Sequence, residues 1–150
     1  LVTGMDSPRF HLALPVDDLQ AADHFYAELL GCPRGRRSER WTDYDFWGHQ
    51  LVAHLVAADA MPTLACNPVD GEDVPASHFG VVLPWDDLQR LIARLKALGI
   101  EFAIAPTVRF AERCGEQQTC FVCDPAGNYL EFKAFRNIDM LFASDGLDYP

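Results

Sequence analysis

A glutamate in the last third of the chain stands in a setting that can support chemistry. The stretch from Asp124 to Lys133, with the sequence DPAGNYLEFK, predicts a tight turn followed by a strand of alternating character. In such a strand Glu131 shares one face with Tyr129 and Lys133. If the Glu131 carboxylate is buried, its charge needs a partner, and a metal ion is one such partner. The alternative is an ordinary glutamate that faces solvent on an antiparallel strand.

The composition narrows the class of protein. Hydrophobic residues make up 49% and charged residues 23% of the 150 positions, which is ordinary for a soluble globular protein. The formal net charge of −10 disfavours binding to nucleic acid or to an anionic membrane surface, so we expect a small-molecule partner instead. The five cysteines are an odd number without a dense framework, which favours a reducing compartment, and we expect a cytoplasmic protein.

Hydrophobic periodicity predicts the elements that must position Glu131. The first half is expected to hold a strand, a helix capped by Asp17 and Asp18, and three further strands. These elements fall at residues 9–16, 19–30, 34–39, 42–47 and 49–57. Residues 61–76 are rich in turn formers and predict a loop-like linker. The second half repeats the order of elements, at residues 78–83, 88–98, 101–110, 117–123 and 128–135.

The two halves also share a run of letters. Residues 10–20, FHLALPVDDLQ, align with residues 79–89, FGVVLPWDDLQ, and seven of the eleven positions are identical. We interpret this as an internal duplication of a βαβββ module. One such module leaves a face of its curved sheet uncovered. We therefore expect an α+β fold in which two tandem βαβββ modules form a half-open mixed barrel, with a cleft that binds a small ligand.

This interpretation gives one domain, residues 1–150. Its expected parts are a first module at about 9–60, the linker at about 61–76, a second module at about 77–135 and a C-terminal tail at 136–150. We expect the tail to pack against the body of the protein or against a second subunit.

Three motifs resemble the vicinal oxygen chelate superfamily, which includes glyoxalase I, fosfomycin-resistance enzymes, bleomycin-binding proteins and extradiol dioxygenases. They are HLALPVDDL at residues 11–19 with Phe25-Tyr26 following, SHFGV at 77–81, and DPAGNYLE at 124–131. The resemblance extends over nearly the whole chain, from about Arg9 to Phe135.

In that superfamily a histidine early in the first strand, a histidine that opens the second half and a glutamate in the last strand hold a divalent metal ion. The resemblance implies His11, His78 and Glu131 as these ligands. Two neutral imidazoles and a carboxylate leave positions open for a bidentate oxygen substrate and suit Fe2+, Mn2+, Zn2+ or Ni2+. The chain departs from its own repeat at one point, because His11 aligns with Gly80. His78 thus comes two residues early, on the same face but about 7 Å away along the strand.

Two further residues are candidates for the site. Some members of the superfamily add a fourth ligand from the last strand of the first half, and His54 lies where that residue would fall. His54 is accordingly either a fourth ligand or an acid or base near the metal. Tyr129 shares a face with Glu131 and could donate a hydrogen bond to a ligand oxygen, or could simply pack at the strand edge.

The resemblance implies a metal-dependent enzyme that acts on a small substrate chelated through adjacent oxygens. A dioxygenase and a glyoxalase-like isomerase or lyase both fit, and a homodimer is expected. The alternative is a metal-free protein that binds a small molecule such as an antibiotic, as the bleomycin-resistance members do.

Overall fold

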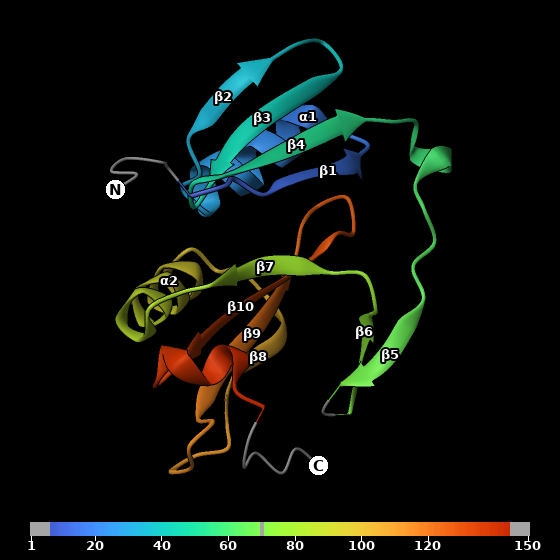
Figure 1. Cartoon of the computed structure of the whole chain (residues 1–150). Helices are drawn as coiled ribbons and strands as arrows, with labels where there is room; N and C mark the ends of the chain where they lie inside the picture. Colours follow the sequence, from blue (N-terminus) through green and yellow to red (C-terminus); the bar gives the residue numbers. More distant parts are fainter. Residues whose placement is uncertain (1–6, 70, 145–150) are drawn as a thin grey trace. The chain divides into compact units, whose positions relative to one another are not determined.

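The computed structural model describes residues 7–69 and 71–144, and the chain divides into two compact units, Leu1–Pro62 and Thr63–Pro150 (Figure 1). Each unit carries a four-stranded mixed sheet and a helix that follows its first strand. The predicted α+β class with two tandem βαβββ modules is confirmed, and each sheet is open rather than closed on itself.

The first unit contains β1 (His11–Val16), α1 (Leu19–Asp23), a π-helical segment η1 (His24–Leu29), β2 (Arg34–Arg37), β3 (Trp41–Phe46), β4 (His49–Leu55) and a 3-10 turn η2 (Ala58–Ala60). Its strands lie in the order β1-β4-β3-β2. β1 runs parallel to β4, whereas β3 is antiparallel to both of its neighbours. The parallel register places His11 opposite Gln50 and Pro15 opposite His54.

The second unit repeats this plan with β7 (Phe79–Val82), α2 (Trp85–Ala97), β8 (Phe102–Arg109), β9 (Gln117–Cys123) and β10 (Tyr129–Phe135). Its strands lie in the order β7-β10-β9-β8, and β7 runs parallel to β10. This register places Gly80 opposite Glu131, just as β1 places His11 opposite Gln50. The duplication seen in the letters is therefore also a duplication of strand pairing.

The alternation of side chains along the strands separates an apolar face from a polar face in each sheet. In the first unit, Tyr44 on β3 packs its ring on Tyr26 of the helical segment, with 5.2 Å between ring centroids. In the second unit the buried side of α2 faces the apolar side of the sheet. The buried apolar residues of that half include Leu88, Leu91, Ile92 and Leu95 on the helix and Cys120, Val122, Leu130 and Phe132 on the strands. The opposite faces hold His11 and His54 in the first sheet and Glu131 in the second.

The segment between the two modules differs from the prediction. Instead of a loop, residues 66–75 include an antiparallel hairpin of β5 (Cys66–Val69) and β6 (Glu72–Pro75). Asp70 lies outside the described residues, and Gly71 adopts a positive φ of 83°. Asp-Gly between two short strands is a strong hairpin signal. Two-stranded hairpins tolerate Pro68 and Pro75 because each strand has an unpaired edge.

The described part of the tail, up to Ser144, packs on the second unit. The Arg136 guanidinium lies 3.6 Å from the ring centroid of Trp85, and its Nε atom lies 2.8 Å from Oε1 of Glu116. The 3-10 helix η3 (Ile138–Phe142) follows, and Met140 Sδ lies 3.1 Å from Cys114 Sγ. The predicted packing against the body holds for these residues, and residues 145–150 lie outside the described range.

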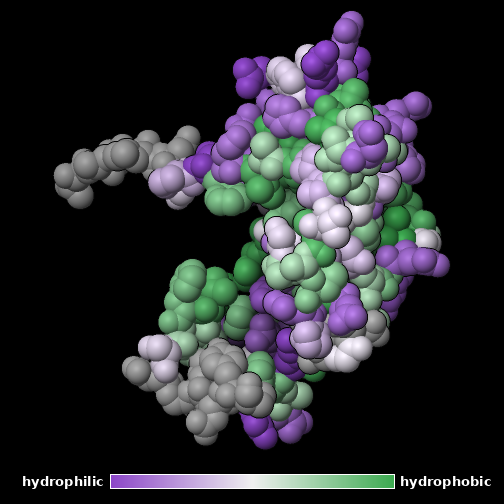
Figure 2. Space-filling model, turned by 90° about the vertical axis from the view of Figure 1, so that its right-hand side faces the viewer, coloured by the Kyte–Doolittle hydropathy of each residue, from purple (hydrophilic) through white to green (hydrophobic). Residues whose placement is uncertain are grey.

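Polar and apolar side chains are mixed over the face that Figure 2 shows. Large apolar residues contribute to the exposed surface, with Phe142 at 89%, Phe10 at 63% and Ile138 at 58% exposure. Scattered exposure of this kind is normal for globular proteins. Among the described residues, none of the helices combines the length and the apolar character that crossing a membrane requires.

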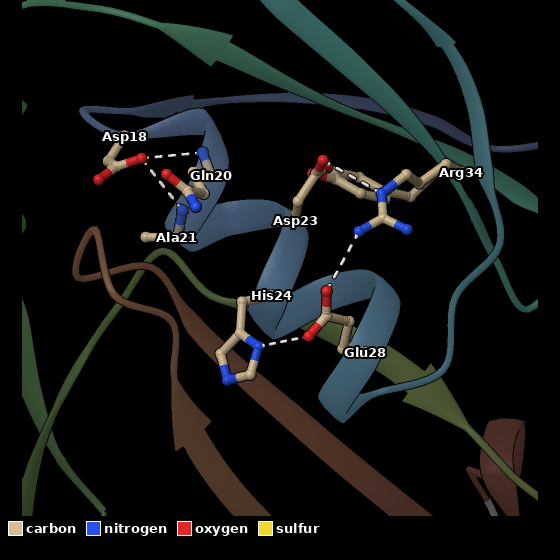
Figure 3. A network of polar contacts seen from close by, with 8 residues as sticks. Asp18, Gln20, Ala21, Asp23, His24, Glu28 and Arg34 are labelled. Atoms are coloured by element: carbon tan, nitrogen blue, oxygen red, sulfur yellow. Dashed lines mark hydrogen bonds and ion pairs between the residues drawn. The ribbon is translucent and has the colours of Figure 1, made fainter.

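The helix of the first unit spans the predicted residues but changes type part-way. Asp18 caps its start, because its Oδ1 accepts hydrogen bonds from the amides of Gln20 and Ala21 (Figure 3). From His24 the helix widens, and the Leu30 amide donates to the Phe25 carbonyl five residues back, at 3.0 Å. Helices usually widen in this way only for a single turn.

An ion-pair network joins this helix to β2 (Figure 3). Arg34 Nε lies 3.1 Å from Asp23 and its Nη2 lies 3.5 Å from Glu28, which also contacts His24 at 2.7 Å. The buried Tyr44 donates to Asp23 at 2.6 Å, and burial together with this bond raises the pKa of its hydroxyl. The network anchors the helix, so we assign its carboxylates a structural role.

Candidate functional site

Glu131 lies in the middle of β10, between β7 and β9. Its register partners are Gly80 on β7 and Phe121 on β9, so both edges of its strand are paired. The side chain is only 16% exposed. The interpretation of Glu131 as an ordinary surface glutamate therefore does not fit, and the question is what compensates its charge.

Three side chains surround the Glu131 carboxylate. The Thr119 hydroxyl donates to Oε1 at 2.6 Å, and Lys133 Nζ lies 3.2 Å from the same oxygen. The other oxygen, Oε2, lies 3.4 Å from Nε2 of His78. Thr119 is buried, so its hydrogen bond fixes the orientation of the carboxylate and turns Oε2 towards the imidazole.

The His78 ring is held by its other nitrogen. Nδ1 lies 3.0 Å from the carbonyl oxygen of Pro75, and a carbonyl can only accept, so Nδ1 must donate a proton there. In the neutral ring, Nε2 then carries a lone pair that points towards the Glu131 carboxylate. The separation of 3.4 Å is longer than the about 2.7–3.2 Å of an N–H···O hydrogen bond. A proton on Nε2 would make this contact an ion pair, and a cation between the two atoms would equally satisfy both acceptors.

Gly80 explains why the histidine of the second half comes two residues early. A β-carbon on residue 80 would lie 1.6 Å from the carbonyl oxygen of Glu131, so only glycine fits opposite this residue. Position 80 corresponds to His11 in the repeat and cannot carry a histidine. The imidazole is supplied by His78 instead, which precedes β7 and packs edge-on against Phe121 with 5.2 Å between ring centroids.

A pocket of about 300 Å³ lies over this pair in the second unit. Both polar and apolar side chains line it, from the segment around β7, from β10 and from η3. The lining residues are His78, Phe79, Gly80, Val81, Val82, Glu131, Lys133 and Leu141. A small molecule would therefore meet a carboxylate, an imidazole and an ammonium group beside apolar walls.

In the first unit, His11 is held by Gln50. Its Nδ1 lies 2.8 Å from Oε1 of Gln50, whose amide nitrogen lies 3.2 Å from Oδ2 of Asp43. Arg36 approaches the same carboxylate oxygen with Nε at 3.3 Å and Nη2 at 3.4 Å. Asp43 is buried, at 7% exposure. These side chains come from all four strands of the sheet.

The two remaining candidates are His54 in the first unit and Tyr129 in the second. His54 is exposed and lies opposite Pro15 and Trp41, so it is four residues, or about 13 Å, along β4 from the partner of His11. The structure therefore does not bring His54 and His11 together within the first unit. Tyr129 shares the face of Glu131 and packs against the buried cluster of Val74, Ile104 and Phe121.

Two observations bear on a metal centre. In residues 7–69 and 71–144, no group of three or more His, Cys, Asp or Glu side chains is arranged to hold a metal ion. His78, Glu131 and His11 are side chains of types that bind divalent metal ions, and of these the structure brings His78 and Glu131 into contact. Burial raises the pKa of the Cys120 thiol to about 12, and the Glu131 charge adds to this, so Cys120 remains a protonated core residue.

Comparison with known proteins identifies the family. Residues 10–132 match the model of the Glyoxalase/Bleomycin resistance protein/Dioxygenase superfamily. The chain belongs to this superfamily. A glyoxalase/bleomycin resistance protein/dioxygenase from Alicyclobacillus acidocaldarius is 34% identical, with a TM-score of 0.75, and the match covers 90% of this chain and 96% of that one. The resemblance stated from the motifs is thereby confirmed.

More distant structures of the superfamily share the fold. The fosfomycin resistance protein FosX from Listeria monocytogenes is 17% identical with a TM-score of 0.66, and the match covers 91% of this chain and all of that one. Lactoylglutathione lyase from Agrobacterium tumefaciens is 19% identical with a TM-score of 0.59, covering 86% and 94%. Comparison with curated protein sequences finds no significant match.

Several residues of the site were not predicted. Thr119 and Pro75 orient the second-unit pair, and Asp43 and Gln50 orient His11. Thr119 could have been found by counting back from the tight turn at 124–128, because that turn sets the β9–β10 register. The sequence contains no comparable local signal for Pro75, whose contribution is a backbone carbonyl.

Proposed function

We propose that the protein is a metal-dependent enzyme of the superfamily, acting on a small substrate chelated through two adjacent oxygens. The observation that carries the proposal is the approach of His78 Nε2 to Glu131 Oε2 at 3.4 Å, with Nδ1 committed to the Pro75 carbonyl. A lone pair and a carboxylate face each other there, and a divalent cation satisfies both.

The ligands we propose, on the basis of the superfamily to which the chain belongs, are His11, His78 and Glu131. Two imidazoles and one carboxylate would leave positions for substrate oxygens and suit Fe2+, Mn2+, Zn2+ or Ni2+. His11 supports this assignment because the Gln50 oxygen accepts from Nδ1 and leaves Nε2 with its lone pair. Of the two roles predicted for His54, the register argues against the ligand role, because a metal ligand must lie within about 2.0–2.1 Å of an ion that His11 also binds. The acid–base role of His54 stays part of the proposal.

The metal, when bound, would supply Lewis-acid activation of the chelated oxygens. Residues of the chain would orient the carboxylate and bind the substrate. Thr119 keeps the Glu131 carboxylate in one orientation, and Lys133 brings a positive charge to the same pocket. That ammonium would bind an anionic oxygen of the substrate. Tyr129 lies on the face of Glu131, where its hydroxyl would donate to a ligand oxygen. Dioxygenase and isomerase or lyase chemistry both use such a site.

Metal titration tests this function. Chelator-treated protein would be titrated with Fe2+ under anaerobic conditions and with Mn2+, Zn2+ and Ni2+, by calorimetry and elemental analysis. Glu131→Gln and His78→Ala should weaken binding by about tenfold or more, whereas Glu101→Gln, an exposed glutamate of the same half, should not. Failure of the unaltered protein to bind any of the four ions above trace levels would overturn the proposal.

One observation favours a second function. The Glu131 carboxylate has an ion-pair partner within the chain, because Lys133 Nζ lies 3.2 Å from its Oε1, and this suits a metal-free protein that binds a small molecule such as an antibiotic. In that case the Lys133 and Glu131 charges would serve recognition alone. Binding of a glycopeptide or phosphonate antibiotic with equal affinity in His11→Ala, His78→Ala and unaltered protein would establish this function.

The substrate and the assembly follow from further measurements. Catechols, methylglyoxal with thiols, and antibiotics would be screened against the metal-loaded protein for turnover. The resemblance supports a homodimer, which sedimentation equilibrium would show as twice the mass of the chain.

A further inference from the structure

A line of hydrogen bonds crosses the whole sheet of the first unit and ends at His11. It begins at Arg36 on β2, passes through Asp43 on β3 and Gln50 on β4, and reaches Nδ1 of His11 on β1. The contact distances along it are 3.3, 3.2 and 2.8 Å. Burying the Asp43 carboxylate in the middle of a strand costs free energy, and its hydrogen bonds to Arg36 and Gln50 offset that cost.

The direction of this line is set by its acceptor. The Asp43 carboxylate can only accept, so the Gln50 amide must turn its NH2 group towards Asp43. Its carbonyl oxygen then faces His11, and Nδ1 of the imidazole must be the donor. Reversing the Gln50 amide would place an oxygen against the carboxylate and an NH2 group against Nδ1, which loses one contact and inverts the other.

We propose that Asp43 and Gln50 are positioning residues that hold His11 as its Nδ1–H tautomer and thereby keep the Nε2 lone pair available. A histidine without a partner at Nδ1 favours the Nε2–H form in water, so the arrangement works against the intrinsic preference. The second unit reaches the same result with a backbone group, because the Pro75 carbonyl accepts from Nδ1 of His78. The two halves of the duplication thus prepare their histidines by different means.

Arg36 has a supporting part in this line. Its side chain is 79% exposed, so its ion pair with Asp43 is screened by solvent. Gln50 is the residue that touches the imidazole, and Asp43 acts through it. We therefore expect the largest effect at Gln50, a smaller one at Asp43 and the smallest at Arg36.

The tautomer can be measured without any metal. Two-bond proton–nitrogen correlation spectra of the metal-free protein at pH about 8.5, where histidine side chains are ordinarily neutral, distinguish the two forms by their nitrogen shifts. His11 should be Nδ1–H in the unaltered protein and shift to Nε2–H in Gln50→Met. Asp43→Ala should give a mixture, because Gln50 can then adopt either orientation.

Gln118→Met is the matched control, since Gln118 is a half-buried strand glutamine that contacts Gln89 and no histidine. It should leave the His11 spectrum unchanged. An Nδ1–H form of His11 that persists in Gln50→Met overturns the inference, as does an Nε2–H form in the unaltered protein. If Gln50→Met does not fold, Asp43→Ala decides by the same criterion.

The consequence for metal binding rests on the proposed function. Gln50→Met should lower the affinity for the metal by about tenfold to a hundredfold, and Gln118→Met should not change it. If the unaltered protein binds no metal, the proposed function fails and the tautomer spectra still decide the role of Gln50. If it binds metal and Gln50→Met binds equally well, only the link between the tautomer and the metal fails.

Discussion

Gly80 and Glu131 are register partners whose backbones approach so closely that a β-carbon on residue 80 would lie 1.6 Å from the Glu131 carbonyl oxygen. β10, which carries Glu131, and β7, which follows His78, therefore approach each other at a point where residue 80 has no room for a side chain. This contact sets the position of Glu131 relative to the imidazole. It also makes residue 80 a sensitive point for both stability and metal binding.

We expect Gly80→Ala to lower the free energy of unfolding by about 1–3 kcal/mol, because a methyl group forces β7 and β10 apart. Urea denaturation followed by circular dichroism would measure the change. Ser77→Ala, at an exposed neighbouring position, serves as the control. A Gly80→Ala protein as stable as the control would show that the two strands can separate at no cost.

The hydrogen bond from Thr119 to Glu131 gives a second prediction. Thr119→Val keeps the shape of the side chain but removes the donor at 2.6 Å from Oε1. A largely buried carboxylate then loses a partner, so we expect a loss of about 1–3 kcal/mol in stability and of about tenfold in metal affinity. Thr107→Val is the control, because that hydroxyl bonds its own exposed strand at Ala105. Equal effects at both threonines would contradict the assignment.

Periodicity and duplication were sufficient to predict the fold, because both depend on local pattern. The alternation in 128–135 put Glu131 on the polar face, and the shared letters of 10–20 and 79–89 indicated two equivalent sheets. The helix at 19–30 was predicted in extent but not in type. The apolar spacing at 19–30 gives no signal for the wider turn in which the Leu30 amide bonds the Phe25 carbonyl.

The partners of the site residues were less accessible to prediction, for a reason of topology. The β9–β10 register is set by the tight turn at 124–128, so Thr119 could be counted from it. β1 and β4 are parallel and far apart in the chain, so no turn sets their register. The sequence alone could not decide whether Gln50 or His54 lies opposite His11. The carbonyl of Pro75 is not predictable in the same way, because the turn formers at 61–76 predict a loop where the structure has a hairpin.

Lys133 provides a test of charge in the pocket. Its ammonium lies 3.2 Å from Oε1 of Glu131 and would repel a divalent cation bound at the same carboxylate. Lys133→Met should therefore raise metal affinity by about three- to tenfold at low salt, with a smaller gain at high salt. Lys96→Met, an exposed lysine on α2, should have no effect. Weaker metal binding in Lys133→Met would mean that Lys133 supports the ligands instead of opposing the cation.

Because Cys32 is buried, we expect the free energy of unfolding to fall at alkaline pH. Burial raises the pKa of its thiol from 9.0 to about 12, and the Asp45 charge adds to this. Above pH about 9 the unfolded chain releases a proton that the folded state keeps, so stability is complete below that pH and falls above it. The slope is at most about 1.4 kcal/mol per pH unit.

Urea unfolding at pH about 8 and about 10.5 would measure this decline, and Cys32→Ala should show a shallower one. Cys66→Ala, which removes an exposed thiol, should decline like the unaltered protein. Identical slopes in all three proteins would show that the Cys32 thiol ionises as easily in the folded state as in the unfolded one.

The last prediction separates the two roles of His54. Since the register places His54 about 13 Å along β4 from the partner of His11, we expect His54→Ala to leave metal affinity within about twofold of the unaltered protein. An acid–base role would instead lower turnover by about a hundredfold or more with little change in metal content. His49→Ala, a substitution on the same strand but on the opposite face, is the control. A tenfold loss of metal affinity in His54→Ala alone would make His54 a ligand and would require β4 to present it beside His11.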